Sequence, residues 1–512
     1  MRLIQFSKKL LFVPVAAGAL LCSCMEATEG ESEKNTLTVD PESSFTYNIN
    51  GNVNFFDSTE QEDSEYDEKE FKNEITIQFY EDAAPKIEYN GLEDEVTITS
   101  YEDKGKAHLI IRAEKKVNYI LKGTSESGSL LIFSEKKFKL TLDNLNLSND
   151  SGLPAICSQT KKRCFIETKG TATIKDAEGD GNYSLGSEYV KVKIGEEIEY
   201  YDAKGAIFSE GELIFCGSGT LNVEGRCKHA IASDQYVRIN EGANVNIIGS
   251  NKDGIQTNDA VLIYGGKLNI KNVGKLFNLH SNQYPNLYSS RKMNGIQCEK
   301  GYIVVKGGEI DITSLGYGIY ANCDDFNKSD IMTKKSFIYI DGGKINIETT
   351  EDEGHGISSK SHLIISGDAK INITATGDDA KGIETDGNED YAVEAEYERG
   401  DIVLAGGTVT IFSKDSVVDP SGKLNIVGGT LNAIGGSCFS RDKVEKGSKP
   451  CGIASFDKAM RVGEEITVAG NKISTLYANL TTAKVVLIND TLKAGDEVEV
   501  KVGSQTAKAE VE

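Results

Sequence analysis

The chain has no tryptophan and only 7 prolines among its 512 residues. Without tryptophan, any carbohydrate site has to rely on tyrosine rings, hydrogen bonds or a metal ion. Scarce proline suits strands that donate hydrogen bonds along their whole length. Positive charge is also scarce, because 56 Lys and Arg stand against 79 Asp and Glu, for a formal net charge of −23. This balance argues against a nucleic-acid partner, since such proteins carry basic surfaces.

Long apolar runs are missing except at the N-terminus, which has the pattern of an export signal. Arg2, Lys8 and Lys9 precede a short apolar segment that ends at Leu21, too short for an ordinary spanning helix. The sequence Leu21-Cys22-Ser23-Cys24 resembles a bacterial lipobox, in which Cys24 is acylated. We therefore expect a signal peptide over 1–23, a lipidated tether over 24–40, and a lipoprotein in the outer membrane or at the cell surface. A plain signal peptide that ends in cysteines is the alternative.

The remaining cysteines leave two interpretations open. An exported protein can form disulfides, and the close pairs are 157/164 and 216/227. The alternative is that these cysteines are small buried hydrophobic residues. No Cys or His pair has the spacing of a zinc site.

Glycine is abundant, at 52 residues, and much of it belongs to an internal repeat. Copies include Val261–Ile270, Ile303–Ile312, Ile338–Ile347 and Ile402–Ile411, each an apolar segment, a Gly-Gly turn, and an apolar-polar-apolar segment. A small residue followed by an aliphatic one, as in Gly356-Ile357, precedes each copy. Period-2 alternation identifies strands.

The shorter steps between copies are about 22–26 residues, which suits three short strands per coil. The prediction is an all-β, right-handed parallel β-helix, whose stacked coils share one core of inward aliphatic residues. Glycines at the corners would supply positive φ angles. A β-sandwich or a propeller is the alternative, but a propeller blade needs roughly 40 residues.

The regions outside the repeat complete the predicted domain organisation. We expect an N-terminal β region with the first coils over 41–150, the helix repeats over 151–450, and a small C-terminal β cap over 451–512. Three insertions, 271–294, 320–336 and 386–400, are expected to form loops on one face. The acidic run from Asp57 to Glu70 is expected to be a solvated loop.

These motifs resemble the bacterial carbohydrate-binding β-helix family, whose fold is similar to that of pectate-type polysaccharide lyases. The matching segments include Asn118–Thr124, Lys139–Leu147, Lys252–Gln256 and Gly428–Leu431. The resemblance implies a calcium-bearing β-helix that binds plant-type polysaccharide, pectic or cellulosic, without established catalysis. The family often has Asp-Asp-Gly-Ile where this chain has Asp253-Gly-Ile, so one acidic residue is missing at that step.

Acidic residues beside the Gly-Ile steps are the candidate metal ligands. Calcium takes six to eight oxygen ligands, and acids at one coil corner could share an ion with the next coil. The first candidate cluster is Asp378, Asp379 and Asp386, and the second is Asp253, Asn258 and Asp259. A third is the run Glu351–Glu353. The alternative for all three is a solvated acidic corner, because Asp is a common turn residue.

Catalytic and sugar-binding candidates are fewer. Lys381 could be the base of a pectate-type lyase if its pKa were lowered, but neighbouring carboxylates work against that. In the first insertion, the rings of Tyr284 and Tyr288 could cover a sugar, and Arg291 and Lys292 could meet a uronate. The alternative is that these tyrosines pack the loop against the helix.

Together these features predict an exported, lipid-anchored, monomeric protein that binds polysaccharide, with calcium as the cofactor and without catalysis. Two alternatives stay open: a calcium-dependent polysaccharide lyase, and a structural adhesin of the cell envelope that contacts protein partners.

Overall fold

A computed structural model gives the fold of this protein. It describes residues 34–40, 43–48, 53–57, 63, 68–101, 105–179, 183, 189–194, 197–274, 293–322, 336–387 and 400–512. The chain divides into two units, Met1–Glu33 and Lys34–Glu512, and only the second contains described residues. Within these ranges the helices are two short 3₁₀ segments, Glu68–Phe71 and Arg441–Lys443, and no helix is long and apolar enough to cross a membrane.

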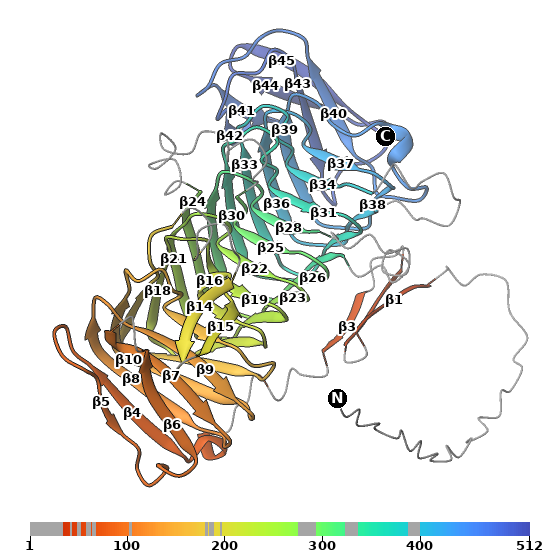
Figure 1. Ribbon diagram of the computed structural model, residues 1–512. Helices are drawn as coiled ribbons and strands as arrows, with labels where there is room; N and C mark the ends of the chain where they lie inside the picture. The colour runs from red at the N-terminus through yellow and green to blue at the C-terminus, as the bar shows by residue number, and fades with distance from the viewer. Residues whose placement is uncertain are drawn as a thin grey trace, which may run out of the picture. The chain divides into compact units, whose positions relative to one another are not determined.

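Most of the described strands are parallel and pair with their counterparts in the next repeat (Figure 1). A first ladder runs in sequence order through β12 (Cys164–Lys169), β17 (Leu213–Cys216), β20 (Tyr236–Ile239), β23 (Ala260–Ile263), β26 (Tyr302–Val305), β29 (Ile338–Ile340), β32 (Leu363–Ile365), β35 (Ile402–Leu404) and β38 (Leu424–Ile426). A second ladder runs through β13 (Thr171–Lys175), β18 (Thr220–Gly225), β21 (Asn244–Ser250), β24 (Lys267–Val273), β27 (Glu309–Ser314), β30 (Lys344–Thr349), β33 (Lys370–Ala375), β36 (Thr408–Ser413) and β39 (Thr430–Gly435).

The third ladder is a 12-stranded sheet. Its strands are parallel except for the antiparallel pair β6–β7. They are β6 (Val96–Tyr101), β7 (Gly105–Ala113), β9 (Ser129–Ser134), β11 (Ile156–Ser158), β16 (Gly205–Ser209), β19 (His229–Ser233), β22 (Ile255–Thr257), β25 (Ile296–Cys298), β28 (Ile319–Ala321), β31 (Ile357–Ser359), β34 (Ile383–Thr385) and β37 (Val418–Pro420). The fold is therefore all-β with long parallel sheets, as the repeat predicts.

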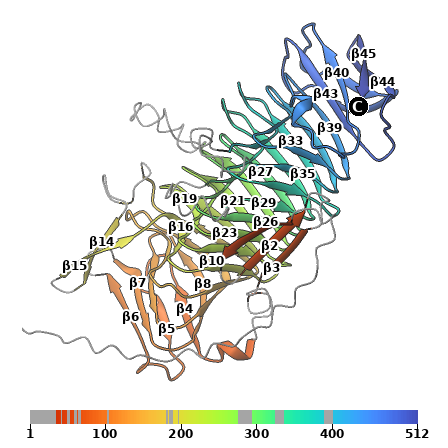
Figure 2. The ribbon, with the colours of Figure 1, turned by 90° about the vertical axis from the view of Figure 1, so that its right-hand side faces the viewer.

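Antiparallel pairs occur at both ends of the ladders. At the N-terminal end, β4 (Glu74–Phe79) pairs antiparallel with β5 (Lys86–Glu88) and parallel with β8 (Asn118–Ser125), and β8 pairs parallel with the long strand β10 (Phe138–Ser148). At the C-terminal end the strands are β40 (Gly452–Phe456), β41 (Glu465–Val468), β42 (Asn471–Thr475), β43 (Ala483–Ile488), β44 (Glu497–Val502) and β45 (Gln505–Val511). Strand β43 pairs with the last repeat strand, β39 (Figure 2), so the edge of the second ladder is covered.

Two smaller sheets lie outside the ladders. One is an antiparallel sheet of β1 (Lys34–Asp40), β2 (Ser43–Asn48) and β3 (Val53–Asp57), so the last residues of the predicted tether form a strand. The other is the hairpin of β14 (Tyr189–Ile194) and β15 (Glu197–Asp202).

The core is a continuous set of stacked aliphatic columns. In the third ladder, for example, Ile255, Ile296, Ile319, Ile357 and Ile383 are in register and fully buried. Burial of each such side chain contributes roughly 1.5–3 kcal/mol to the free energy of folding. Because every column continues through many repeats, one repeat alone could not bury its aliphatic residues.

The glycines of the repeat have two different physical roles. The second residue of each Gly-Gly turn has a positive φ, for example 96° at Gly308 and 87° at Gly343, as predicted for the corners. The glycine before each core isoleucine has no positive φ and is needed for space. A Cβ at Gly356 would collide with Ile373 Cγ2 and would lie 2.6 Å from the Gly382 carbonyl oxygen. The Gly-Ile motif therefore reflects close packing between neighbouring coils.

The seven cysteines in the described ranges form no disulfide with one another, and all except Cys438 are buried. The disulfides considered for 157/164 and 216/227 are thus not formed, and the interpretation as small buried side chains is confirmed. Burial raises the pKa of the Cys157 thiol to about 12, so this thiol stays protonated at neutral pH.

The acidic run from Asp57 to Glu70 is not a purely solvated loop. Asp63 is fully buried. Its carboxylate accepts a hydrogen bond of 2.5 Å from the Tyr236 hydroxyl and lies 3.1 Å from Arg163 Nε. The expectation of a solvated loop is therefore wrong at Asp63, because charge composition does not reveal a specific partner far away in the sequence.

Candidate functional site

Several predicted site residues lie outside the described ranges. These are the proposed lipidation site and the four residues proposed for sugar contact in the first insertion, namely Cys24, Tyr284, Tyr288, Arg291 and Lys292. Their roles stay predictions.

The first acidic cluster is divided between two ends of one strand. Asp378 and Asp379 precede β34, and Asp386 follows it. Asp378 forms an ion pair with Lys414 from the following repeat, whereas Asp386 pairs with Lys360 from the preceding repeat. Asp378 and Asp386 are thus each neutralised by a different lysine, at opposite ends of β34.

Acidic corners of successive repeats do stack on each other, as the sequence suggests. The Glu353 amide donates to the Asp378 carbonyl at 2.7 Å, and the Asp378 amide donates to Asp352 Oδ1 at 3.0 Å. Glu353 and Asp379 both have positive φ angles, of 56° and 54°. The stacking is therefore a backbone arrangement in which the Asp352 side chain caps the next corner.

The second acidic cluster is also spread over different environments. Asp253 is buried; its Oδ1 accepts from the Asn294 amide at 2.7 Å, and its Oδ2 lies 3.2 Å from His229 Nδ1. Asn258 is partly exposed, and its Nδ2 donates to Asp234 Oδ1 at 3.4 Å. Asp259 is exposed. Asp253 Oδ1 is thus occupied by a backbone amide.

These contacts do not fit a preformed calcium site. Within the described ranges, no three His, Cys, Asp or Glu side chains gather in a group that could hold a metal ion. Calcium takes six to eight oxygens, whereas Asp378 and Asp386 pair with lysines and Asp253 Oδ1 accepts from a backbone amide. Calcium binding stays a prediction.

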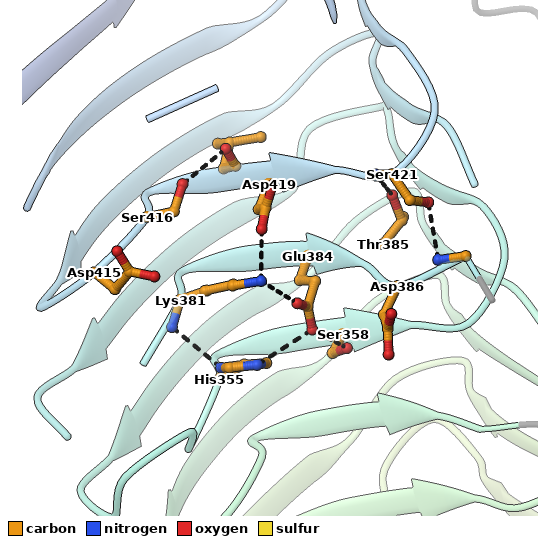
Figure 3. A network of polar contacts seen from close by, with 12 residues as sticks. His355, Ser358, Lys381, Glu384, Thr385, Asp386, Asp415, Ser416, Asp419 and Ser421 are labelled. Atoms are coloured by element: carbon orange, nitrogen blue, oxygen red, sulfur yellow. Dashed lines mark hydrogen bonds and ion pairs between the residues drawn. The ribbon is translucent and has the colours of Figure 1, made fainter. Parts of the chain in front are cut away.

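The residues around Lys381 form a compact polar network on the outward side of the third ladder (Figure 3). Lys381 Nζ lies 2.5 Å from Glu384 Oε1 and 2.5 Å from Asp419 Oδ2. The other oxygen of Glu384 accepts a hydrogen bond from Ser358 Oγ at 3.0 Å and lies 3.2 Å from His355 Nε2. The Lys381 amide donates to His355 Nδ1 at 3.1 Å, which places the imidazole proton on Nε2, facing Glu384.

This network does not prepare Lys381 as a base. Partial burial works to lower the Lys381 pKa, but the charge of Glu384 and the hydrogen bonds with Asp419 and Glu384 raise it well above its usual value. A lysine held in its charged form by two carboxylates cannot accept a proton near neutral pH. The geometry therefore disfavours the lyase role considered for this residue.

A repeated arrangement explains why histidine, aspartate and asparagine precede the Gly-Ile steps. The side chain of each accepts a hydrogen bond from the backbone N–H of the equivalent residue one repeat later. The bonds are His229 Nδ1 from Asp253 at 3.2 Å, Asp253 Oδ1 from Asn294 at 2.7 Å, and Asn294 Oδ1 from Tyr317 at 2.9 Å. These side chains satisfy buried amides at a coil corner, which is a structural role.

His229 gives this arrangement a pH dependence. Burial lowers the pKa of His229 from 6.5 to about 4. Below pH 6.5 the His229 imidazole binds a proton in the unfolded chain but not in the folded chain. The contribution of neutral His229 to the free energy of unfolding is therefore complete above pH 6.5 and declines as the pH falls toward 4. We expect the wild type to lose about 2 kcal/mol more unfolding free energy than His229→Asn between pH 7.5 and pH 4.5.

Asn is the matched replacement because Asn294 makes the same amide contact at the equivalent position two repeats later. Urea unfolding of both proteins at the two pH values measures the difference. Equal losses in the two proteins would show that His229 does not titrate as described.

The accessible polar surface lies on the second ladder. The middle outward position of successive strands is nearly always an amide, a carboxylate or a threonine, and we call this set the asparagine column. In register, its members are Thr173, Asn222, Asn246, Asn269, Asp311, Asn346, Asn372, Thr410 and Asn432. All nine are partly or fully exposed, whereas Glu384, Ser358 and His355 of the third ladder are buried.

Side-chain hydrogen bonds order the asparagine column. Asn246 Nδ2 donates to Asn222 Oδ1 at 3.1 Å, Asn346 Nδ2 to Asp311 Oδ1 at 2.6 Å, and Asn372 Nδ2 to Asn346 Oδ1 at 2.8 Å. Each amide nitrogen has a second proton, and each oxygen a second lone pair. The column therefore presents donors and acceptors at the strand spacing of about 4.8 Å.

Sequence inspection missed this column although its signal was present. The polar residue of the apolar-polar-apolar segment repeats as Asn or Asp in Leu268-Asn-Ile270, Ile310-Asp-Ile312, Ile345-Asn-Ile347 and Ile371-Asn-Ile373. Asparagine is depleted in strands, so its recurrence at one strand position indicates a use other than local propensity.

A family model described as "Carbohydrate-binding domain-containing protein" matches residues 106–353, 289–443 and 326–510. These segments overlap and together span residues 106–510, which is most of the chain and all three ladders from β9 onward. The chain belongs to the carbohydrate-binding domain-containing protein family. For a member of this family, an exposed and regular polar surface is a candidate ligand surface, and the asparagine column meets that description.

One solved structure is similar to this carbohydrate-binding family member: a polysaccharide lyase-like protein from C. thermocellum, in a gadolinium derivative. The sequences are 18% identical, the match covers 61% of this chain and 95% of the other, and the TM-score is 0.37. No curated protein matches the chain.

Proposed function

We propose that this protein binds polysaccharide of a pectic or cellulosic type along the asparagine column. The observation that supports this is the in-register column of exposed amides on a chain that belongs to a carbohydrate-binding family. Sugar hydroxyl groups are both donors and acceptors, and so are amides. A rigid row of such groups suits an extended polymer of similar groups.

The spacing of the column favours a polymer over a single sugar. Each step along the parallel ladder advances by about 4.8 Å, and the backbone fixes the steps without loop movement. A polymer that contacts several weak positions at once gains affinity through effective concentration. A single ring would contact only one or two positions.

The architecture that we propose is a right-handed parallel β-helix with three strands per coil. The three in-register ladders support this interpretation, since each repeat contributes one strand to each ladder. We propose a right-handed coil because connections between parallel strands of one sheet are nearly always right-handed. An outward ladder face is then continuous over many coils, which is what an extended ligand requires.

The placement that we propose for the protein is a monomer held by an acylated Cys24 at the outer membrane or cell surface, after removal of the signal peptide. It rests on the sequence of the N-terminus alone. Lipid anchoring would put the asparagine column within reach of polymers outside the cell. Mass spectrometry of the membrane-extracted protein would detect the acyl groups on Cys24.

Replacing two amides of the column tests the function. In Asn222→Leu/Asn246→Leu both partners of the 3.1 Å hydrogen bond become apolar groups of similar size, a change that leaves no buried polar group without a partner. We expect binding to cellulose or polygalacturonate to weaken roughly thirtyfold, since two hydrogen bonds contribute about 1 kcal/mol each and about 1.4 kcal/mol is a factor of ten. Depletion binding to insoluble cellulose and affinity electrophoresis in polygalacturonate measure the change.

The matched control is Glu384→Gln, which alters a polar residue of the third ladder and should leave polysaccharide binding unchanged. Absence of binding by the wild type to any polysaccharide, with and without calcium, would refute the function. Selective binding to envelope proteins in that case would favour the adhesin alternative. Weaker binding in Glu384→Gln alone would place the ligand on the third ladder instead.

A further inference from the structure

A groove lies on the second ladder in the C-terminal half of the asparagine column, with Tyr477 of the cap among its lining residues. Its volume is about 370 Å³, within the range of small-ligand sites. It is open to solvent, and its polar lining comes from two neighbouring columns of β27, β30 and β33. The polar lining residues are Asp311, Thr313, Asn346, Glu348, Asn372 and Thr374.

Tyr477 closes one side of this groove. It follows β42 in the cap, directly after Leu476, which is buried in the core of the cap. The Tyr477 ring packs edge-on against Phe412 with 5.5 Å between ring centroids, yet about half of the side chain, 51%, is exposed. The ring is therefore held by Phe412 and remains about half exposed where it lines the groove.

The polar groups of the groove form a defined hydrogen-bonding set. The donor chain runs from Asn372 to Asn346 to Asp311, which leaves the Asn372 oxygen and the second Asp311 oxygen as acceptors. Thr313 and Thr374 add hydroxyl groups, and the remaining amide protons add donors. This combination matches the hydroxyl groups on one edge of a sugar ring, while an aromatic ring can cover its C–H face.

The charge of the lining decides which sugars fit. Two carboxylates, Asp311 and Glu348, line the groove, and no lysine or arginine does. The nearest lysine on β30, Lys344, stands on the other side of the asparagine column and pairs with Glu309 at 3.0 Å. A uronate in the groove would meet two like charges well within the screening length of about 8 Å. A neutral ring avoids this repulsion.

We propose that this groove is a subsite for a neutral hexose or pentose unit of the polysaccharide, that Tyr477 covers the face of the ring, and that binding needs no metal ion. This inference rests on the proposed function and makes it more specific. It places a neutral sugar unit of the ligand on β27, β30 and β33, next to Tyr477 of the cap. Lys267 of β24 stands beside Asn269 of the column, outside the groove.

Short oligosaccharides test the subsite, because they can occupy the groove without spanning the column. Wild type, Tyr477→Ala and Tyr477→Phe are titrated by calorimetry with cellotriose, xylotriose, mannotriose and trigalacturonate in the presence of EDTA. We expect at least one neutral trisaccharide to bind the wild type at least tenfold more tightly than trigalacturonate does. Tyr477→Ala should weaken that binding at least tenfold, and Tyr477→Phe less than threefold.

A second variant separates this proposal from the function as a whole. Asn222→Leu/Asn246→Leu lies outside the groove, so it should keep trisaccharide affinity while it weakens binding of the polymer. If no neutral trisaccharide binds, if Tyr477→Ala binds as the wild type does, or if trigalacturonate binds more tightly, the subsite is refuted. Continued binding of the polymer in those cases would leave the proposed function standing.

Discussion

Gly356→Ala should destabilise the protein by about 3 kcal/mol or more, at the upper end of the cost of overpacking a core. A Cβ at this position would collide with Ile373 Cγ2 and approach the Gly382 carbonyl oxygen to 2.6 Å. Neither neighbour can move freely, because Ile373 is buried in the core and Gly382 lies in the next coil. The free energy of unfolding, measured by urea denaturation, would report the loss.

Gly463→Ala is the matched control for Gly356→Ala. Gly463 has a φ of 86°, and nothing lies within 4 Å of a Cβ built on it. This substitution should lower the free energy of unfolding by only about 1–2 kcal/mol, which is the cost of holding an alanine in the left-handed backbone conformation. If Gly356→Ala costs no more than Gly463→Ala, close approach between coils is not the reason for the Gly-Ile motif.

The second large effect is expected at Glu384. Glu384→Ala should destabilise the protein by about 3 kcal/mol, because removal of one partner leaves the other charge partly buried and unpaired. Lys381 would keep only Asp419, and both Ser358 and His355 would lose the acceptor that they share. Thermal and urea unfolding of the variant measure the change.

Glu384→Gln separates charge from hydrogen bonding in this network. The amide oxygen can still accept from Ser358 and His355, so the loss should be smaller, about 1–2 kcal/mol. Polysaccharide binding should be unchanged in both variants once they are folded. Weakened binding in Glu384→Gln would mean that the third ladder contacts the ligand.

Much of the fold could be predicted from the sequence because two features of the repeat, its alternating residues and its Gly-Gly turns, indicate the same structure. Alternating aliphatic residues define the strands, and the Gly-Gly turns mark the corners. Parallel pairing follows because equivalent residues of successive repeats can be buried together only when they are stacked. The role of the glycine before Ile357 was not predictable, since only the packed structure shows which neighbour a Cβ would meet.

The site was predicted less well, for a physical reason. Asp253, which precedes a Gly-Ile step, is predicted as a metal ligand from its residue type, but its Oδ1 accepts the backbone amide of Asn294 in the next repeat. Sequence cannot tell a carboxylate that binds an ion from one that caps a corner. The groove could not be predicted either, because Tyr477 and Asn372 are far apart in the sequence, with the last repeats and part of the cap between them.

The most direct test of the central claim is the dependence of affinity on ligand length. The column from Asn222 to Asn432 comprises seven steps of the ladder, or roughly 34 Å at the strand spacing. Affinity measured for oligosaccharides of increasing length should rise until the ligand reaches this length and then level off. The rise should be smaller in Asn222→Leu/Asn246→Leu. Equal affinity for a trisaccharide and a long polymer, or the same rise in that variant, would contradict an extended binding surface on the asparagine column.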